Sequence, residues 1–172
     1  MSAEIRIDVA AADEQPLLEG LMQFYIYDFS ELEPDGSDAL DFNAAGRFAP
    51  YPHLADYWRE EGRVPLLIRR GAKPVGFALV NRLSHLGEPL DRNMAEFFIA
   101  RKHRRHGVAS EAVRQVLARY PGRWEVAVAQ RNVGALKFWP GAIAAAPNVT
   151  DLARREGDGE RWRGPVYTFR AG

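Results

Sequence analysis

Cysteine is absent from the 172-residue sequence, and this absence excludes several classes of function. Without thiols the protein has no disulfide framework, no thiolate metal site and no cysteine nucleophile to carry a covalent intermediate. A chain without cysteine also fits a reducing compartment, so we expect a cytoplasmic location. At this length and with 47% hydrophobic residues, one well-buried core is expected, which predicts a single domain over residues 1–172.

Long hydrophobic runs and excess charge of one sign are missing as well. Residues 1–12 contain no apolar core of signal-peptide length, and no apolar run approaches the roughly 20 residues that a membrane-spanning helix needs. The 23 Lys and Arg residues balance 23 Asp and Glu residues, which argues against a general nucleic-acid binder. We therefore expect a soluble protein with neither nucleic acid nor membrane among its partners.

The common nucleotide-binding motifs are also missing: the sequence has no Gly-Lys-Ser/Thr and no dinucleotide-type glycine triplet. What is present is Arg104-x-x-Gly107-x-Ala109, between the apolar run 94–100 and the amphipathic stretch 108–120. Unpaired N–H groups at a helix start attract anions, and Gly107 has no Cβ to obstruct a phosphate. The segment predicts a pyrophosphate site, with a solvated basic loop that caps the helix as the alternative.

Metal binding is not expected in this segment. His103 and His106 are three residues apart, but the surrounding Arg and Lys side chains would repel a cation. We therefore predict that the protein has no metal site.

Hydrophobic periodicity predicts a mixed α/β fold. Strands are expected at 5–9, 64–69, 74–83, 94–100, 124–129, 142–146 and 165–169, and helices after Asp13, at 54–61, at 108–120 and at 134–139, where Pro140 would end the last one. Residues 28–41 form an acidic loop and 151–163 a polar loop. The strand–helix–strand unit 94–129 predicts one parallel pair, and the flanking hairpins predict antiparallel neighbours.

Together with the later segment Asn132-x-x-Ala135-x-x-Phe138-Trp139, this unit resembles the GNAT superfamily of N-acetyltransferases. The resemblance in element order covers nearly the whole chain. It implies a mostly antiparallel sheet with one splayed parallel pair and helices on both faces. The segments 27–30, 57–58, 95–98 and 162–166 also resemble a bacterial subgroup of predicted acetyltransferases whose substrate is unknown.

The resemblance further implies which residues bind acetyl-CoA. The pyrophosphate would lie on the backbone of the turn, formed by Arg104, Arg105, His106, Gly107, Val108 and Ala109. Pantetheine would lie along Phe97, Phe98 and Ile99, with Phe138 and Trp139 as walls of its channel. Asn132 matches a family asparagine that touches the cofactor arm, although it equally suits the cap of the following helix.

Glu96 is the candidate general base, because an acceptor ammonium must lose a proton before it attacks the thioester. Partial burial would raise the pKa of this carboxyl toward a useful value, whereas a solvent-facing Glu on an alternating strand is the alternative. Trp139 stands where the family commonly has a Tyr, and an indole cannot release a proton at useful pH. Water, Tyr25, Tyr27 or Tyr51 would then protonate the thiolate, or it would leave unaided.

The resemblance places the acceptor pocket at the first helices and the loop between them, which here contribute Tyr25, Tyr27, Asp28 and Trp58. Carboxylates beside aromatic rings favour a cationic amine, on a small molecule or a peptide. We expect direct transfer in a ternary complex, since no cysteine can hold the acyl group, and the sequence leaves a homodimer open. Two competing hypotheses remain. The protein is a non-catalytic acyl-CoA sensor, or it is a nucleic-acid binder that uses residues 101–106.

Overall fold

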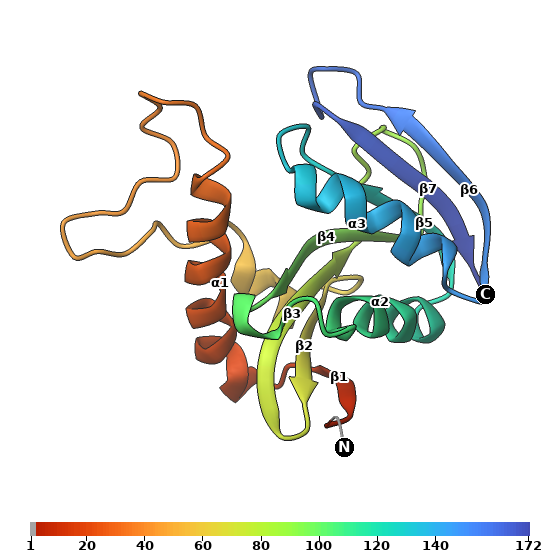
Figure 1. Cartoon of the computed structure of the whole chain (residues 1–172), viewed down its shortest axis with the longest axis horizontal. Helices are drawn as coiled ribbons and strands as arrows, with labels where there is room; N and C mark the ends of the chain where they lie inside the picture. The colour runs from red at the N-terminus through yellow and green to blue at the C-terminus, as the bar shows by residue number, and fades with distance from the viewer. Residues whose placement is uncertain (1–2) are drawn as a thin grey trace.

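The computed structural model describes residues 3–172, in which a seven-stranded sheet is flanked by helices (Figure 1). The strand order is β1-β2-β3-β4-β5-β7-β6, and β4 and β5 are parallel while the other neighbours are antiparallel. The strands are β1 (Ile5–Val9), β2 (Val64–Arg70), β3 (Lys73–Asn81), β4 (Arg92–Ile99), β5 (Gly122–Ala127), β6 (Val149–Glu156) and β7 (Pro165–Ala171). The helices are α1 (Gln15–Ser30), α2 (Val108–Arg119) and α3 (Val133–Ala144), with short 3-10 helices at Ala12–Glu14, Leu54–Trp58 and Arg101–His103. This confirms the predicted fold class.

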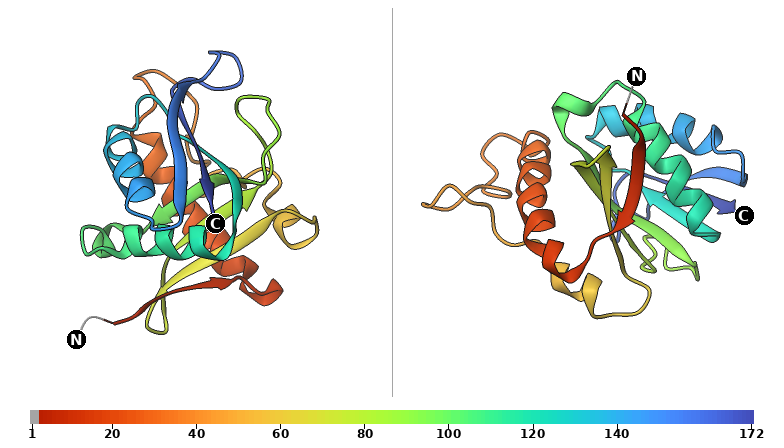
Figure 2. Two further views of the ribbon diagram at one scale, coloured as in Figure 1. Left: turned by 90° about the vertical axis from the view of Figure 1, so that its right-hand side faces the viewer. Right: turned by 90° about the horizontal axis from the view of Figure 1, so that it is seen from below.

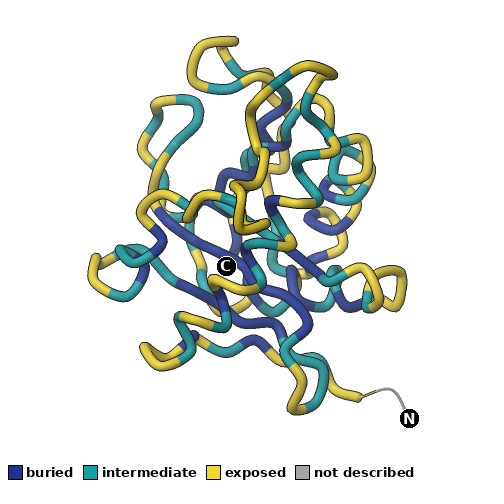
Figure 3. The backbone as a smooth tube through the Cα atoms, turned by 90° about the vertical axis from the view of Figure 1, so that its left-hand side faces the viewer, coloured by how far each residue is buried: buried dark blue, intermediate teal, exposed yellow. Residues whose placement is uncertain are grey.

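Helices cover both faces of the sheet, as Figure 2 shows from below, and each face carries a hydrophobic cluster. On one face, α1 packs on the sheet through Leu18, Met22 and Ile26, and the 3-10 helix Leu54–Trp58 packs there through Leu54 and Tyr57. On the other face lie α2 and α3, with side chains such as Val113, Val116 and Ile143. Alternating side chains of the central strands supply both layers, because successive strand residues point to opposite faces. Buried residues accordingly run through the strands in the middle of the molecule (Figure 3).

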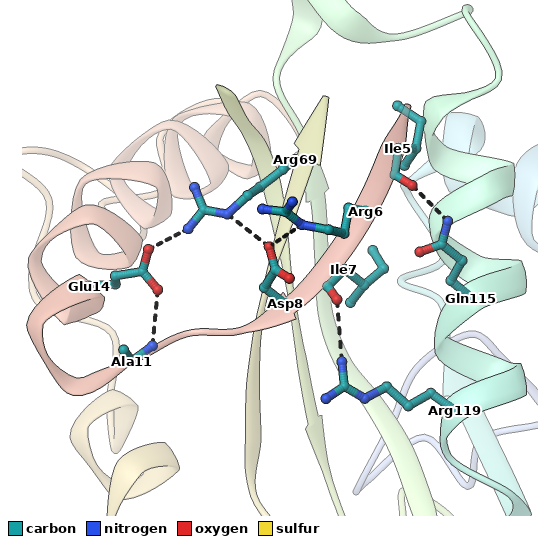
Figure 4. A network of polar contacts seen from close by, with 9 residues as sticks. All are labelled: Ile5, Arg6, Ile7, Asp8, Ala11, Glu14, Arg69, Gln115 and Arg119. Carbon is teal, nitrogen blue, oxygen red and sulfur yellow. Dashed lines mark hydrogen bonds and ion pairs between the residues drawn. The ribbon is translucent and has the colours of Figure 1, made fainter. Parts of the chain in front are cut away.

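The edge strand β1 is fixed to α2 by polar contacts (Figure 4). Gln115 Nε2 donates to the carbonyl oxygen of Ile5 at 2.8 Å, and Arg119 Nη1 donates to that of Ile7 at 3.3 Å. On the other side of the strand, Arg69 Nε donates to Asp8 at 3.0 Å. These contacts hold α2 along the sheet and so fix the position of its N-terminus.

The parallel pair opens soon after it begins. Only Arg92 with Trp124 and Asn93 with Glu125 are paired between β4 and β5, after which the strands diverge. In the pairing with β3, Leu79 lies opposite Glu96 while Val80 lies opposite Met94, so Ala95 is the extra residue of a β-bulge. The sheet is therefore splayed at the strand that precedes the basic turn.

Three predictions for the C-terminal third were wrong. Pro140 does not end a helix at residue 139, because α3 continues through it to Ala144. The segment 142–146 is therefore mostly helix rather than strand, and the burial of Trp139, Ala142 and Ile143 against the sheet offsets the lost N–H of the proline. The predicted polar loop 151–163 is also wrong over its first half, where β6 pairs with β7.

Candidate active site

A cavity of about 680 Å³ lies where β4 and β5 diverge. Its volume is in the usual range for small-molecule sites. It is open both to α1 and the loop after it on one side and to the start of α3 on the other. Its lining consists of Tyr25, Ile26, Phe29, Asp38, Leu40, Asp41, Phe48, Ala49, Pro50, Tyr51, Pro52, His85, Met94, Ala95, Glu96, Phe97, Val126, Ala127, Val128, Ala129, Asn132, Ala135, Trp139 and Trp162.

Glu96 lies in this cavity between two tyrosine hydroxyls. Tyr51 Oη donates to Glu96 Oε1 at 2.6 Å, and Tyr25 Oη donates to Glu96 Oε2. Burial raises the pKa of Glu96 above its usual value, while the two hydroxyl donors act in the opposite direction. Burial, together with the neighbouring carboxylate, raises the pKa of both tyrosines. The side chain is half-buried in the cavity wall, so the solvated surface position that the sequence left open does not apply.

The β-bulge at Ala95 decides which side chain faces which half of the cavity. Glu96 points to the α1 face, where Tyr25 meets it, and Phe97 points to the opposite face. There Phe97 stacks on Phe138 at a centroid distance of 6.2 Å and meets Trp139 edge-on at 5.2 Å. Phe98 and Ile99 follow as buried residues. One strand thus presents a carboxylate to one half of the cavity and an aromatic wall to the other.

The predicted pyrophosphate turn has the backbone that its sequence requires. Gly107 is the N-cap of α2 with φ of +73°, and a Cβ built on it would meet no atom within 4 Å. No side chain in the described chain caps this helix, so the first N–H groups after Gly107 are available to a ligand. Arg105 also has a positive φ, of 63°, and both Arg105 and His106 are exposed. The turn presents its backbone, rather than side chains, to an approaching anion.

The Arg104 side chain is 41% exposed but is held by two contacts at the turn. Its Nε donates to the carbonyl oxygen of Ile99 at 2.7 Å, and its Nη2 donates to Asp28 of α1. Arg101 Nη2 reaches the same carboxylate at 2.8 Å. We call these three residues, Asp28, Arg101 and Arg104, the Asp28 clamp. The clamp connects α1 to the turn and holds the turn against the end of β4.

Asn132 caps α3 and also lies in the cavity wall. Its Oδ1 accepts a hydrogen bond from the backbone N–H of Ala135 at 3.0 Å, which caps α3, and the residue lines the cavity. Trp139, one of the buried residues of α3, lines the same half.

Three of the four predicted acceptor residues lie outside the cavity lining: Tyr27, Asp28 and Trp58. Tyr27 is 58% exposed, with its ring 6.5 Å from that of Phe48. Trp58 donates its indole N–H to the carbonyl oxygen of Ala10 at 2.9 Å. Of the four predicted acceptor residues, the structure therefore brings Tyr25 to the cavity.

The sequence predicted no site role for His85 or for Trp162, although Trp162 begins one of the segments that resemble the acetyltransferase subgroup; both residues lie in loops between strands, 82–91 and 157–164. Tyr51 was one of three tyrosines considered as an acid, but its contact with Glu96 spans 45 residues of sequence.

Within residues 3–172, no group of three or more His, Asp or Glu side chains is arranged to hold a metal ion. No helix in the described part of the chain is long and apolar enough to cross a membrane.

Comparison with solved structures identifies the architecture. An acetyltransferase from Thermus thermophilus superposes with a TM-score of 0.67 at 16% identity, over 100% of both chains. Spermidine N-acetyltransferase from Vibrio cholerae, in complex with CoA and spermine, gives 0.57 at 10% identity over 96% of this chain and 94% of that one. The ribosomal-protein-S18-alanine N-acetyltransferase from Escherichia coli gives 0.53 at 10% identity over 98% and 93%. At these identities the likeness defines a fold shared by acetyltransferases with different acceptors.

The sequence itself supports the narrower assignment. A model of the acetyltransferase (GNAT) family matches residues 23–140, which is more than half of the chain. No curated protein matches the sequence. The chain belongs to the GNAT acetyltransferase family, whose members transfer an acyl group to an amine.

Proposed function

We propose that this protein transfers an acetyl group from acetyl-CoA to a primary amine that carries no anionic group. The observation that carries this proposal is the cavity between β4 and β5, which has an aromatic wall on the α3 side and Glu96 on the α1 side. A donor that enters from the α3 side and an acceptor that enters from the α1 side would meet at the splay. This arrangement suits direct transfer in a ternary complex.

The residues of the turn and of α3 fit acetyl-CoA. The pyrophosphate would be held by the backbone of residues 104–109, where Gly107 leaves open space and the α2 N-terminus favours negative charge. The pantetheine arm would lie between the free edge of β4 at Phe97–Ile99 and the side chains of Asn132, Phe138 and Trp139. When bound, acetyl-CoA supplies the thioester carbonyl that the amine attacks.

Glu96 is the proposed catalytic base. Burial raises its pKa, which increases its affinity for a proton, and the two tyrosine hydroxyls hold the carboxylate in place. Both hydroxyls donate to Glu96, so neither Tyr25 nor Tyr51 points a free proton at a leaving group. We therefore assign no side chain as the acid, because a CoA thiol is acidic enough to leave near neutral pH.

The charge of the cavity supports a cationic acceptor. Among the described residues that line it are three carboxylates, Asp38, Asp41 and Glu96, and neither Lys nor Arg. Aromatic rings of Tyr25, Phe29 and other residues surround them. An ammonium group on an apolar body suits this lining, whereas a carboxylate or phosphate on the acceptor would find no basic partner. Of the predicted acceptor residues, we propose that Tyr25 contacts the acceptor. Asp28 would act indirectly, because its carboxylate holds Arg101 and Arg104 of the turn.

Titration calorimetry with acetyl-CoA, followed by thiol release with phenethylamine as acceptor, tests the proposal. Phenethylamine combines a primary ammonium with an aromatic body, as the lining requires. Saturable binding followed by thiol release is the expected result. Binding without release for phenethylamine, a lysine peptide and spermidine would favour a sensor, and the absence of binding would contradict the proposal.

A further inference from the structure

The cavity contains a second titratable side chain, which the proposed function does not use. His85 lies in the loop between β3 and β4 and lines the cavity beside Trp162. The two rings meet edge to face with their centroids 4.7 Å apart. An imidazole held against an indole in a cavity wall has a fixed orientation, which is a requirement for proton transfer.

A buried carboxylate lies behind this imidazole. Glu125 is 3% exposed, and its Oε1 accepts a hydrogen bond from Ser84 Oγ at 2.6 Å. Its Oε2 accepts the backbone N–H of His85 at 2.9 Å and lies 3.9 Å from His85 Nδ1. This Nδ1 is buried, with no hydrogen-bond partner within residues 3–172. Because Nδ1 faces the carboxylate, Nε2 is the ring nitrogen available to a molecule in the cavity.

The His85–Glu125 pair and Glu96 belong to the same half of the cavity. On β5, Trp124 and Val126 belong to the core on the α2 and α3 side, so Glu125 between them points to the opposite face. Glu96 points to that opposite face too, where it meets Tyr25. Two groups that can accept protons therefore face the half of the cavity assigned to the acceptor.

Amide formation removes two protons from the acceptor nitrogen, so a second proton acceptor beside Glu96 has a use. An ammonium has three N–H bonds and the amide product has one, so the acceptor nitrogen loses two protons. As the N–C bond forms and the C–S bond breaks, the electron pair of the C–S bond goes to sulfur, which takes one proton. The other proton goes to water, so the products are the amide, the free thiol and one hydrated proton.

We propose that His85, supported by Glu125, is the second proton acceptor of the acetyl transfer. Nε2 takes one of the two protons and Glu96 takes the other; both are then released to water, from which the departed thiolate takes one. This inference rests on the proposed function.

Burial lowers the pKa of His85 below its ordinary 6.5, so the ring is neutral at pH 7, and the charge of Glu125 acts in the opposite direction. The other charged groups of this region are the Glu88–Arg155 ion pair and Arg161 beside Gly87.

The pH dependence of kcat/KM with phenethylamine tests the proposal. In the wild type, two groups must be deprotonated, so log kcat/KM should rise with a slope of two on the acidic side. His85→Gln should reduce that slope to one and lower kcat by about a hundredfold, the usual contribution of a general base. Glu125→Gln removes the charge that raises the pKa of His85, so its acidic limb should move to lower pH. His53→Asn is the matched control, since His53 pairs with Asp56 outside this cavity and should leave the profile unchanged.

The outcomes separate the two proposals. A wild-type profile in a folded His85→Gln protein that binds acetyl-CoA would overturn the role of His85 and leave the proposed function intact. Wild-type protein that binds acetyl-CoA without any turnover would overturn both. If the variants do not fold, NMR of the four labelled histidines in the wild type gives the answer. The His85 signal should titrate below pH 6.5 and move when phenethylamine is added, and a His85 signal that ignores the amine would overturn the inference.

Discussion

Replacing Tyr51 with Phe should move the acidic limb of the pH–rate profile to higher pH. Tyr51 Oη donates to Glu96 Oε1 at 2.6 Å, a short bond to an ionised acceptor. A hydrogen bond to a charged group is worth about 1.5–3 kcal/mol, and one pKa unit corresponds to about 1.4 kcal/mol. Loss of this bond therefore raises the pKa of Glu96 by about one to two units. Tyr25 still donates to the other oxygen, so the carboxylate keeps a partner and the fold should persist.

The assay is kcat/KM for phenethylamine between pH 5 and 9. Because the proposed role of Glu96 is that of a base, the rate of Tyr51→Phe should fall about tenfold to a hundredfold on the acidic side and approach the wild-type rate at high pH. Tyr120→Phe is the matched control, because this ring packs beside α2 and makes no contact with Glu96. An acidic limb that stays in place in folded Tyr51→Phe would refute the assignment of Glu96 as the base.

Three further results are expected. Gly107→Glu should abolish acetyl-CoA binding in calorimetry, while Gly46→Glu, which has a similar φ of +70° and open space, should bind normally; equal affinity in both variants would disprove the turn assignment. Glu96→Gln should keep acetyl-CoA affinity, lose turnover and raise the Tm more at pH 8 than at pH 4. The folded pKa of Glu96 lies above its unfolded value, so its contribution to stability is complete below the unfolded pKa and is lost as pH rises through the folded one; an equal Tm change at both pH values would argue against a buried charge. Phenethylamine should be preferred over phenylalanine by roughly 30-fold in kcat/KM, since carboxylates about 7 Å apart repel by about 2 kcal/mol at an effective dielectric constant near 20; equal rates would contradict the acidic lining.

Elements with a buried face could be predicted from the sequence, and those without one could not. The β2–β3 hairpin and α2 follow local hydrophobic patterns, and the structure confirms them with shifts of one or two residues at their ends. Strand β6 is exposed along nearly its whole length and pairs with β7 alone, so no hydrophobic alternation marks it. Pro140 misled the prediction of α3 because tertiary burial, which the local pattern does not contain, carries the helix through it.

In the candidate site, too, some parts could be predicted from the local sequence and others could not. The turn at Gly107 is a local motif, so its conformation follows from its own sequence. The orientation of Glu96 depends on the bulge at Ala95, which arises from pairing with β3 and leaves no trace in the alternation of β4. Glu125 lies 40 residues from His85 along the chain, and only the sheet brings them together. Contacts between distant elements are therefore the part of the site that the sequence concealed.

The Asp28 clamp gives the two halves of the site a common mechanical element. Helix α1 touches Glu96 through Tyr25 and, one turn later, the basic turn through Asp28. A shift of α1 on binding of the proposed acceptor would change the support of the turn, and a ligand on the turn would change the position of Tyr25. Thermodynamic linkage makes such an effect equal in both directions, so the acceptor alters donor affinity by the same factor as the donor alters acceptor affinity. If the two proposed sites are occupied together, we expect this helix to couple binding at the two ends of the cavity.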